Sequence, residues 1–423
     1  MAELITYKHA SGMTLYYLPM TDSPVTAVNF FCSIGGSYFD LTQPFKPGTA
    51  HFLEHCLFGG RDAELEAIEQ LGIQVNAFTS HYTIAVTMTG MNDHVLDAAD
   101  KAFRLFFNRE FSGDVVETER SIIHSEIDRS NAYPWTKVSN LVDKEIGNPH
   151  HPHFYPILGT HETLDQITHD NLVEYAERIM VPSNTGLVVA GSSPEYFSKW
   201  VAKMDDLAAM FSGEDPRTPL NHRLKYALPH LEIKDNIKFR HVEDLGSESA
   251  YVMMVSSVSF DDYENEAVRW TVGNTFADTG MSSPYFKRFR DELGIGYQVS
   301  FGGNVDSGAL AYRMNEIDRN RVDEFLNEFD SFMGSLEKHL TEELLEKTIN
   351  SMLTQQLKAN MKPEFRANYF ISNAHFNQIM GLTKDFRFPG FYLDKIRKLT
   401  VDDVLVEIEK IKKTPRTTFV VTK

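Results

Sequence analysis

Apolar residues recur with clear periods in several stretches of this 423-residue chain. In residues 116–127 they return at the spacing of an α-helix, and in residues 50–57 they surround a narrow polar stripe, which indicates a second helix. Residues 82–88 are rich in β-branched and aromatic side chains and predict a strand. Residues 321–361 combine alternating charges with apolar spacing, which is typical of packed amphipathic helices. The chain is therefore expected to mix helices and sheets.

The same patterns occur twice. Three pairs of segments match: 167–172 with 399–404, 186–190 with 418–422, and 70–73 with 292–295. The first two pairs share an offset of 232 residues. In the first pair each copy begins a predicted amphipathic helix with a threonine, Thr168 or Thr400, a residue type that is favoured as an N-cap. We infer two related α/β units of about two hundred residues each.

The length of the chain also indicates at least two domains, because one hydrophobic core rarely serves so many residues. Residues 212–219 are polar and contain Pro and Gly, as linkers do. We therefore expect a first domain at residues 1–212, a linker at 213–229 and a homologous second domain at 230–423. Paired histidines occur in the first domain, and the aligned stretch of the second, around residues 267–270, has none.

Residues 51–55 read His-Phe-Leu-Glu-His and carry the strongest chemical signal. On a helix, His51, Glu54 and His55 share one face, because residues three and four apart lie above one another. Two neutral imidazoles on one face can bind a zinc ion, and the neighbouring carboxylate can take a proton from an attacking water. The order of the residues is the inverted form of the common zinc-peptidase signature.

A catalytic zinc site needs a third protein ligand. Glu119 and Glu126 are seven positions apart on the predicted helix of residues 116–127, so they share a face. One carboxylate could bind the metal while the other orients a ligand or water. His124 is a rival ligand, although it lies well off that shared face.

Together these residues resemble the pitrilysin family of zinc peptidases, in which H-x-x-E-H is followed roughly seventy residues later by E-R-x-x-x-x-x-E. Here His55 and Glu126 are 71 residues apart. The resemblance implies that His51, His55 and Glu126 bind one zinc ion per chain. It further implies that Glu54 is the general base and that Glu119 is a supporting carboxylate.

Residues 76–80, Asn-Ala-Phe-Thr-Ser, match the family segment N-A-x-T-S. In the family this segment is an edge strand to which the substrate peptide adds through backbone hydrogen bonds. The resemblance therefore implies that Asn76, Ala77 and Phe78 bind substrate. Residues 151–159 resemble another family loop, so the neighbouring histidines at 150, 151 and 153 are expected to be structural, without a second metal.

The second half of the chain resembles the family as well. Residues 280–297 are similar to the segment G-x-x-S-S … L-R-E-x-x-G-L-A-Y. In active members the Arg and Tyr of that segment reach the active site from the far half of the enzyme, which implies this role for Arg290 and Tyr297. A guanidinium and a phenol aimed at a developing oxyanion would supply electrostatic stabilisation. The resemblance also implies two α/β domains, each a mostly antiparallel sheet with helices packed on one side.

The composition of the chain limits the kinds of partner and the compartment that we expect. The net charge of −18 argues against nucleic acid and anionic membranes, and no apolar run is long enough to span a bilayer. The N-terminal residues have neither a secretory nor a mitochondrial leader pattern. The two cysteines, Cys32 and Cys56, exclude a disulfide scaffold and fit the cytoplasm. Cys56 follows a ligand directly but should point away from His55, so it is expected to be a core residue.

We predict a zinc endopeptidase that cleaves short or unfolded peptides. Half-length members of the family work as dimers that enclose a chamber, which implies a homodimer here, with a heterodimer of related subunits as the alternative. Two other functions stay open: a narrow maturation peptidase that removes leaders from ribosomally made peptides, and a non-catalytic partner subunit of a peptidase complex.

Overall fold

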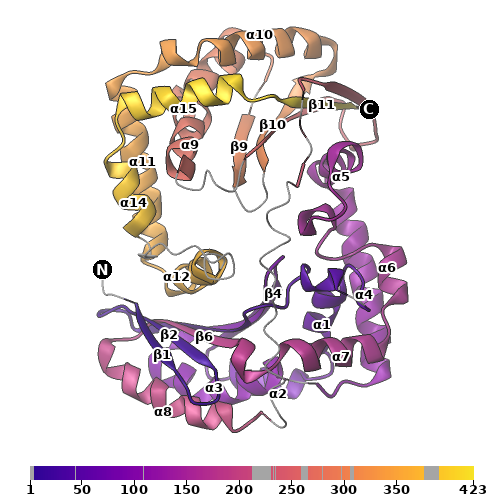
Figure 1. The fold of residues 1–423 in the computed structure, drawn as a ribbon, viewed down its shortest axis with the longest axis vertical. Coiled ribbons are helices and arrows are strands. Elements are labelled where there is room, and N and C mark those ends of the chain that lie inside the picture. Colours follow the sequence, from indigo (N-terminus) through magenta and orange to yellow (C-terminus); the bar gives the residue numbers. More distant parts are fainter. Residues whose placement is uncertain are drawn as a thin grey trace. The chain divides into compact units, whose positions relative to one another are not determined.

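Figure 1 shows the fold of the chain in a computed structural model. The structure describes residues 4–42, 44–107, 109–211, 230–231, 233, 235–258, 265–278, 280–296, 298–304, 309–375 and 390–423. The predicted linker at 213–229 lies outside the described residues. In the described part, no helix combines the length and the apolar content that are needed to cross a bilayer.

The chain forms two compact units, and each unit collects three separate segments. The first unit contains residues 1–128, 155–224 and 359–389, and the second contains residues 129–154, 225–358 and 390–423. Residues 129–154 and 359–389 thus each belong to the unit on the other side of the predicted linker. Each unit therefore contains most of one predicted domain together with a segment of the other.

The first unit is built on a six-stranded sheet in the order β1-β2-β6-β3-β5-β4. The strands are β1 (Ile5–Lys8), β2 (Thr14–Pro19), β3 (Val25–Cys32), β4 (Gln74–Thr79), β5 (Ile84–Met91) and β6 (Thr185–Gly191). β2 and β6 are parallel, and all other neighbours are antiparallel. The central strand β3 is apolar and buried on both faces, so both faces of the sheet must be covered.

Most helices of the first unit pack on one face of its sheet, as Figure 1 shows for α1, α3, α7 and α8. The helices are α1 (Thr49–Phe58), α2 (Asp62–Glu69), α3 (Asn92–Phe106), α4 (Gly113–Ala132), α6 (His161–Gln166), α7 (His169–Ile179), α8 (Phe197–Ala208) and α12 (Pro363–Tyr369). The short helix α12 covers the other face, where Ala367 and the following Phe370 pack against Phe31 and Val188. A late segment of the chain therefore completes the core of the first unit.

The second unit has a five-stranded sheet in the order β7-β11-β8-β10-β9. Its strands are β7 (Lys238–Val242), β8 (Ser249–Ser257), β9 (Gln298–Asn304), β10 (Ala309–Asp318) and β11 (Thr417–Thr422). Its helices are α5 (Pro134–Ile146), α9 (Glu266–Gly273), α10 (Val322–Gly334), α11 (Glu342–Asn360), α14 (Gly390–Arg397) and α15 (Val401–Lys413). Helix α5 covers one face, through Val138 and Val142, and the larger core lies on the other face.

The two sheets have the same topology. Strands β2-β6-β3-β5-β4 and β7-β11-β8-β10-β9 follow the same order, with one parallel pair followed by antiparallel pairs. Helices α7 and α15 each begin at the predicted threonine: the hydroxyl of Thr168 accepts the N–H of Asn171, and that of Thr400 accepts the N–H of Asp403. The predicted N-caps and the mixed α/β fold class, with two mostly antiparallel sheets, are confirmed.

Candidate metal centre

Helix α1 holds three of the predicted site residues, and its first turn is fixed by Asp40. Its N-cap is Gly48, which has a φ of +99°, a conformation that favours glycine, and offers no side chain for capping. Instead, the buried carboxylate of Asp40 accepts the N–H of Gly48 at 2.8 Å and that of Ala50 at 2.9 Å. Burial raises the pKa of Asp40 well above its ordinary value, and these hydrogen bonds oppose the rise. Asp40 thereby sets where α1 begins, next to His51.

His51, His55 and Glu126 come together across α1 and α4. Each offers one ligand atom, and the three atoms all lie within 4.8 Å of one another. Oε2 of Glu126 is 3.8 Å from Nε2 of His51 and 3.5 Å from Nε2 of His55. Ligand atoms around a tetrahedral zinc are about 3.4 Å apart, given zinc–nitrogen bonds of ~2.05 Å. Among the described residues, this is the only such group of potential metal ligands, and its donors fit zinc.

Burial favours the neutral imidazole that a metal requires. Burial, followed by the nearby His55, lowers the pKa of His51 to about 3. Nδ1 of His51 is buried and has no hydrogen-bond partner in the described part of the chain. His55 is held differently, because its Nδ1 lies 2.9 Å from Oε2 of Glu119. A proton on that nitrogen would leave Nε2 of His55 available to a metal.

The two candidate carboxylates of α4 therefore occupy different places. Glu126 faces the Nε2 atoms of both histidines, whereas Glu119 contacts the opposite nitrogen of His55. His124, the rival ligand, turns away and contacts Nδ1 of His161 at 2.6 Å and Oδ1 of Asp165 at 3.0 Å. The geometry thus places Glu126 in the ligand position and Glu119 in an orienting position, while their roles stay predictions.

Glu54 lies beside the three candidate metal ligands, and a residue of the sheet holds its carboxylate in place. The hydroxyl of Thr79, the last residue of β4, donates a 2.6 Å hydrogen bond to Oε2 of Glu54. Burial raises the pKa of Glu54, while the hydrogen bond from Thr79 and the charge of His55 act in the opposite direction. A carboxylate with a raised pKa can accept a proton and later return it.

Strand β4 is at one end of the sheet and carries Asn76, Ala77 and Phe78. It pairs with β5 on one side, with Ala77 opposite Val86, and helix α1 packs against it. The side-chain oxygen of Asn76 accepts the N–H of Ala77 at 2.9 Å. The expected edge position of this segment is thus present next to the metal group, and substrate binding there stays a prediction.

Two predicted site residues, Arg290 and Tyr297, belong to the second half of the chain. Arg290 is on a π-helical turn (Phe286–Glu292) and its guanidinium lies over the ring of Phe286, 4.4 Å from the ring centre. Tyr297 lies outside the described residues. The predicted role of this pair at the metal centre therefore stays a prediction.

His151 and Cys56 are buried side chains. His151 is buried next to the short turn Pro152–Phe154, and its ring lies 5.2 Å from those of His153 and His230. Cys56 is a free, fully buried thiol whose pKa is raised by burial, as expected of a core residue.

The sequence patterns did not predict two residues of the site, Thr79 and Asp40. Thr79 stands within the recognised Asn-Ala-Phe-Thr-Ser segment, but its contact with Glu54 spans 25 positions and has no local signature. Asp40 reaches the start of α1 across a loop, and capping motifs in the sequence are read from residues adjacent to a helix. Both become visible only when the sheet and the loop are folded.

Comparison with known families gives matches over most of the chain. The family model described as Insulinase (Peptidase family M16) matches residues 34–160, which include the metal group. The model described as Peptidase M16 inactive domain matches residues 166–352. The two matches follow one another in the order of the two halves of the chain.

Individual relatives are more distant. The uncharacterized zinc protease YmxG of Bacillus subtilis is 28% identical over 278 residues, which is 62% of this chain and 62% of that protein, less than two thirds of its length. The mitochondrial-processing peptidase subunit beta of Neurospora crassa is 30% identical over 170 residues, 36% of this chain and 35% of that subunit. The crystal structure of a protease from Helicobacter pylori has the same fold, with a TM-score of 0.82, 16% identity and coverage of 100% of this chain and 99% of that chain.

Proposed function

This chain belongs to peptidase family M16, and from that premise we propose that it is a zinc-dependent endopeptidase that cleaves short or unfolded peptides. One observation carries the proposal: the ligand atoms of His51, His55 and Glu126 lie within 4.8 Å of one another. The hydrogen-bonded carboxylate of Glu54 lies beside them.

His51, His55 and Glu126 would hold one zinc ion per chain. When bound, zinc supplies a Lewis acid that lowers the pKa of a water molecule to about 7 and polarises a carbonyl group. Glu119 accepts the Nδ1 proton of His55 and so keeps the imidazole in the tautomer and orientation that a metal ligand needs.

Glu54 would move the proton. Its carboxylate accepts a proton from the water that attacks the scissile carbonyl and then delivers that proton to the amine of the departing fragment. Thr79 holds Oε2 of Glu54 in a fixed direction through its 2.6 Å hydrogen bond. Because Thr79 ends β4, the base is positioned relative to the strand on which a substrate would lie.

The substrate would bind as an added strand on β4. An extended peptide that pairs with this edge uses backbone hydrogen bonds, which place little demand on its sequence. Asn76, Ala77 and Phe78 would line that strand, and Arg290 with Tyr297 would hold the substrate backbone and stabilise the oxyanion. The edge position of β4 beside α1 supports the first part of this proposal.

We further propose that the active form is a dimer in the cytoplasm. One relative is named as a subunit, the beta subunit of mitochondrial-processing peptidase, which supports a partner in general terms. We favour a homodimer over a heterodimer, because two-fold pairing of identical chains is the commonest form of oligomer. The two buried free cysteines fit a reducing compartment.

Cleavage of a peptide library, read by mass spectrometry with and without a metal chelator, tests the proposed function. We expect cuts at internal peptide bonds that disappear with the chelator and return when zinc is added. Cleavage that persists in the chelator would contradict a zinc peptidase.

A further inference from the structure

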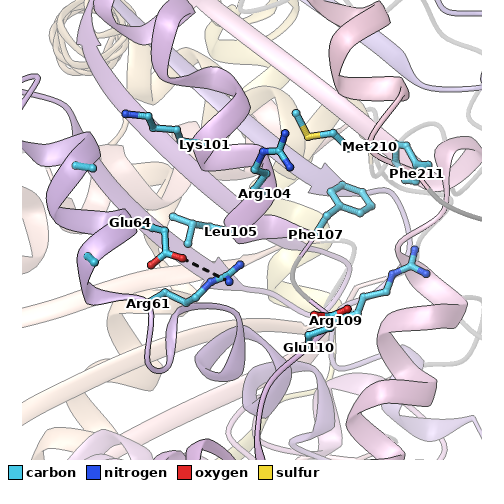
Figure 2. Close-up of a pocket in the computed structure, with 12 residues that line it drawn as sticks. Arg61, Glu64, Lys101, Arg104, Leu105, Phe107, Arg109, Glu110, Met210 and Phe211 are labelled. Atoms are coloured by element: carbon cyan, nitrogen blue, oxygen red, sulfur yellow. Dashed lines mark ion pairs between the residues drawn. The ribbon is translucent and has the colours of Figure 1, made fainter.

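A pocket lined by positive charges lies in the helical layer of the first unit, among α2, α3 and the residues that follow α8 (Figure 2). Its volume is about 640 Å³, within the size range of small-molecule sites. Its lining contains none of the candidate metal-site residues. The function proposed above therefore assigns no role to this pocket.

Four cationic side chains line this pocket: Arg61, Lys101, Arg104 and Arg109. Lys101 and Arg104 are exposed, one helical turn apart on α3, and have no hydrogen-bond or ion-pair partner among the described residues. Such cations are available to a ligand without first breaking an internal contact. The concentration of positive charge stands out in a chain whose net charge is −18.

The other two cations lie at the start of α2 and in the segment that follows α3. Arg61, at the start of α2, forms an ion pair of 3.6 Å with Glu64, and its Nε is buried without a hydrogen-bond partner in the described residues. Arg109 donates a hydrogen bond to the carbonyl of Met180. With Glu64 and Glu110, the lining has four cationic and two acidic side chains, a surplus of two positive charges. That surplus matches a dianion.

The remaining wall is apolar. The rings of Phe107 and Phe211 lie edge to face, 4.4 Å between centres, and Met210 and Leu105 also line the pocket. Figure 2 shows Phe107, Met210 and Phe211 on one side of Arg104 and Arg61 on another. The cationic side chains thus lie next to an apolar surface on which an aromatic ring can pack.

We propose that this pocket binds a phosphate ester with an aromatic or other apolar ring. The phosphate lies among Arg61, Lys101 and Arg104, since guanidinium groups match phosphate with paired hydrogen bonds. The ring lies against Phe107 and Met210. A bare phosphate would leave the apolar wall exposed, and a neutral ring would leave Lys101 and Arg104 without an anion, so a ligand with both groups fits the pocket better than either alone.

Titration calorimetry of the full chain with three probes tests the proposal: inorganic phosphate, naphthyl phosphate and neutral naphthol. We expect naphthyl phosphate to bind at least about tenfold more tightly than inorganic phosphate, because its ring buries apolar surface. Naphthol should give no measurable binding. Affinity for naphthyl phosphate should fall as salt is added, since the contacts are between charges.

Charge reversal locates the site. Arg104→Glu should weaken naphthyl phosphate binding by at least about tenfold, by repulsion in place of attraction. The matched control is Lys358→Glu, an exposed helical position that does not line the pocket, which should change affinity by less than about twofold because an exposed charge outside the lining is screened by salt. Circular dichroism should show both variants folded, and Lys101→Glu provides a second test on the same face.

Several results would overturn the proposal. They are absence of naphthyl phosphate binding, equal affinity for the two phosphates, and an equal loss of affinity in Arg104→Glu and Lys358→Glu. Binding that Arg104→Glu leaves unchanged would also overturn it, because that result places the phosphate elsewhere, for example at the metal centre.

Discussion

The hydroxyl of Thr79 donates a 2.6 Å hydrogen bond to Oε2 of Glu54, so the end of the edge strand β4 is joined directly to the helix that carries the histidines. A substrate that pairs with β4 would therefore lie on the same element that orients the proposed base. In the proposed function, this contact would connect substrate position to catalysis through a single side chain.

Thr79→Val should lower kcat by roughly tenfold, because a hydrogen bond to a charged group contributes about 1.5–3 kcal/mol and part of it orients Glu54. Zinc content should stay unchanged, since Thr79 does not contact the histidines or Glu126. Thr79→Ser, which keeps the hydroxyl, should restore kcat to within about twofold of wild type. Steady-state kinetics with metal analysis would measure both, and a Val variant as fast as the Ser variant would remove the positioning role.

The proposed metal ligands predict the zinc content of wild type and variants. The wild-type protein should hold about one zinc per chain, and His51→Ala or Glu126→Ala should lose it, because two remaining ligands do not form a stable site. Glu119→Gln should keep zinc but bind it about 10- to 100-fold more weakly, as expected of a group that orients a ligand.

Plasma emission spectroscopy of the purified variants would measure this. His124→Ala is the matched control on α4, and it should keep its zinc because His124 contacts His161 and Asp165 instead of the metal group. Equal zinc in wild type and His51→Ala would show that the ligand assignment is wrong.

The proposed homodimer predicts complementation between two inactive variants. Glu54→Gln and Arg290→Ala/Tyr297→Phe should each be nearly inactive, the first for lack of a base and the second for lack of oxyanion stabilisation. If each site takes zinc from one chain and the Arg/Tyr pair from the other, a mixed dimer contains one intact site. After full random exchange, activity should approach about a quarter of wild type, since half of the dimers are mixed.

Subunit exchange must be demonstrated separately, for example with two affinity tags. No recovery despite exchange would mean that each chain completes its own site or that a different protein supplies the second half.

Local patterns predicted the parts of the site that depend on local geometry. His51, Glu54 and His55 share a face because helical spacing requires it, and Thr168 and Thr400 begin their helices because a threonine hydroxyl satisfies a free N–H there. The relation between the two halves of the chain was visible in the repeated segments and reappears in the matching strand orders.

The parts that sequence reasoning missed depend on long-range contacts. The packing of residues 367–371 with the sheet of the first unit depends on which apolar faces the sheets leave open, and the linear pattern does not specify that. The same holds for Asp40 at the start of α1 and for the pocket around Arg104, whose walls come from α2, α3 and the segment after α8. In each case the contact depends on tertiary packing and not on residues that are adjacent in the sequence.

The proposed role of Glu54 as the base of a zinc peptidase is tested most directly by kcat for peptide cleavage by Glu54→Gln, measured together with the zinc content of the variant. The variant should retain the fold and wild-type zinc, because the amide replaces the carboxylate without touching the imidazoles or Glu126. Its kcat should fall by about 10²- to 10⁴-fold, the usual contribution of positioned proton transfer. A variant with full zinc and more than about a tenth of the wild-type kcat would contradict the account.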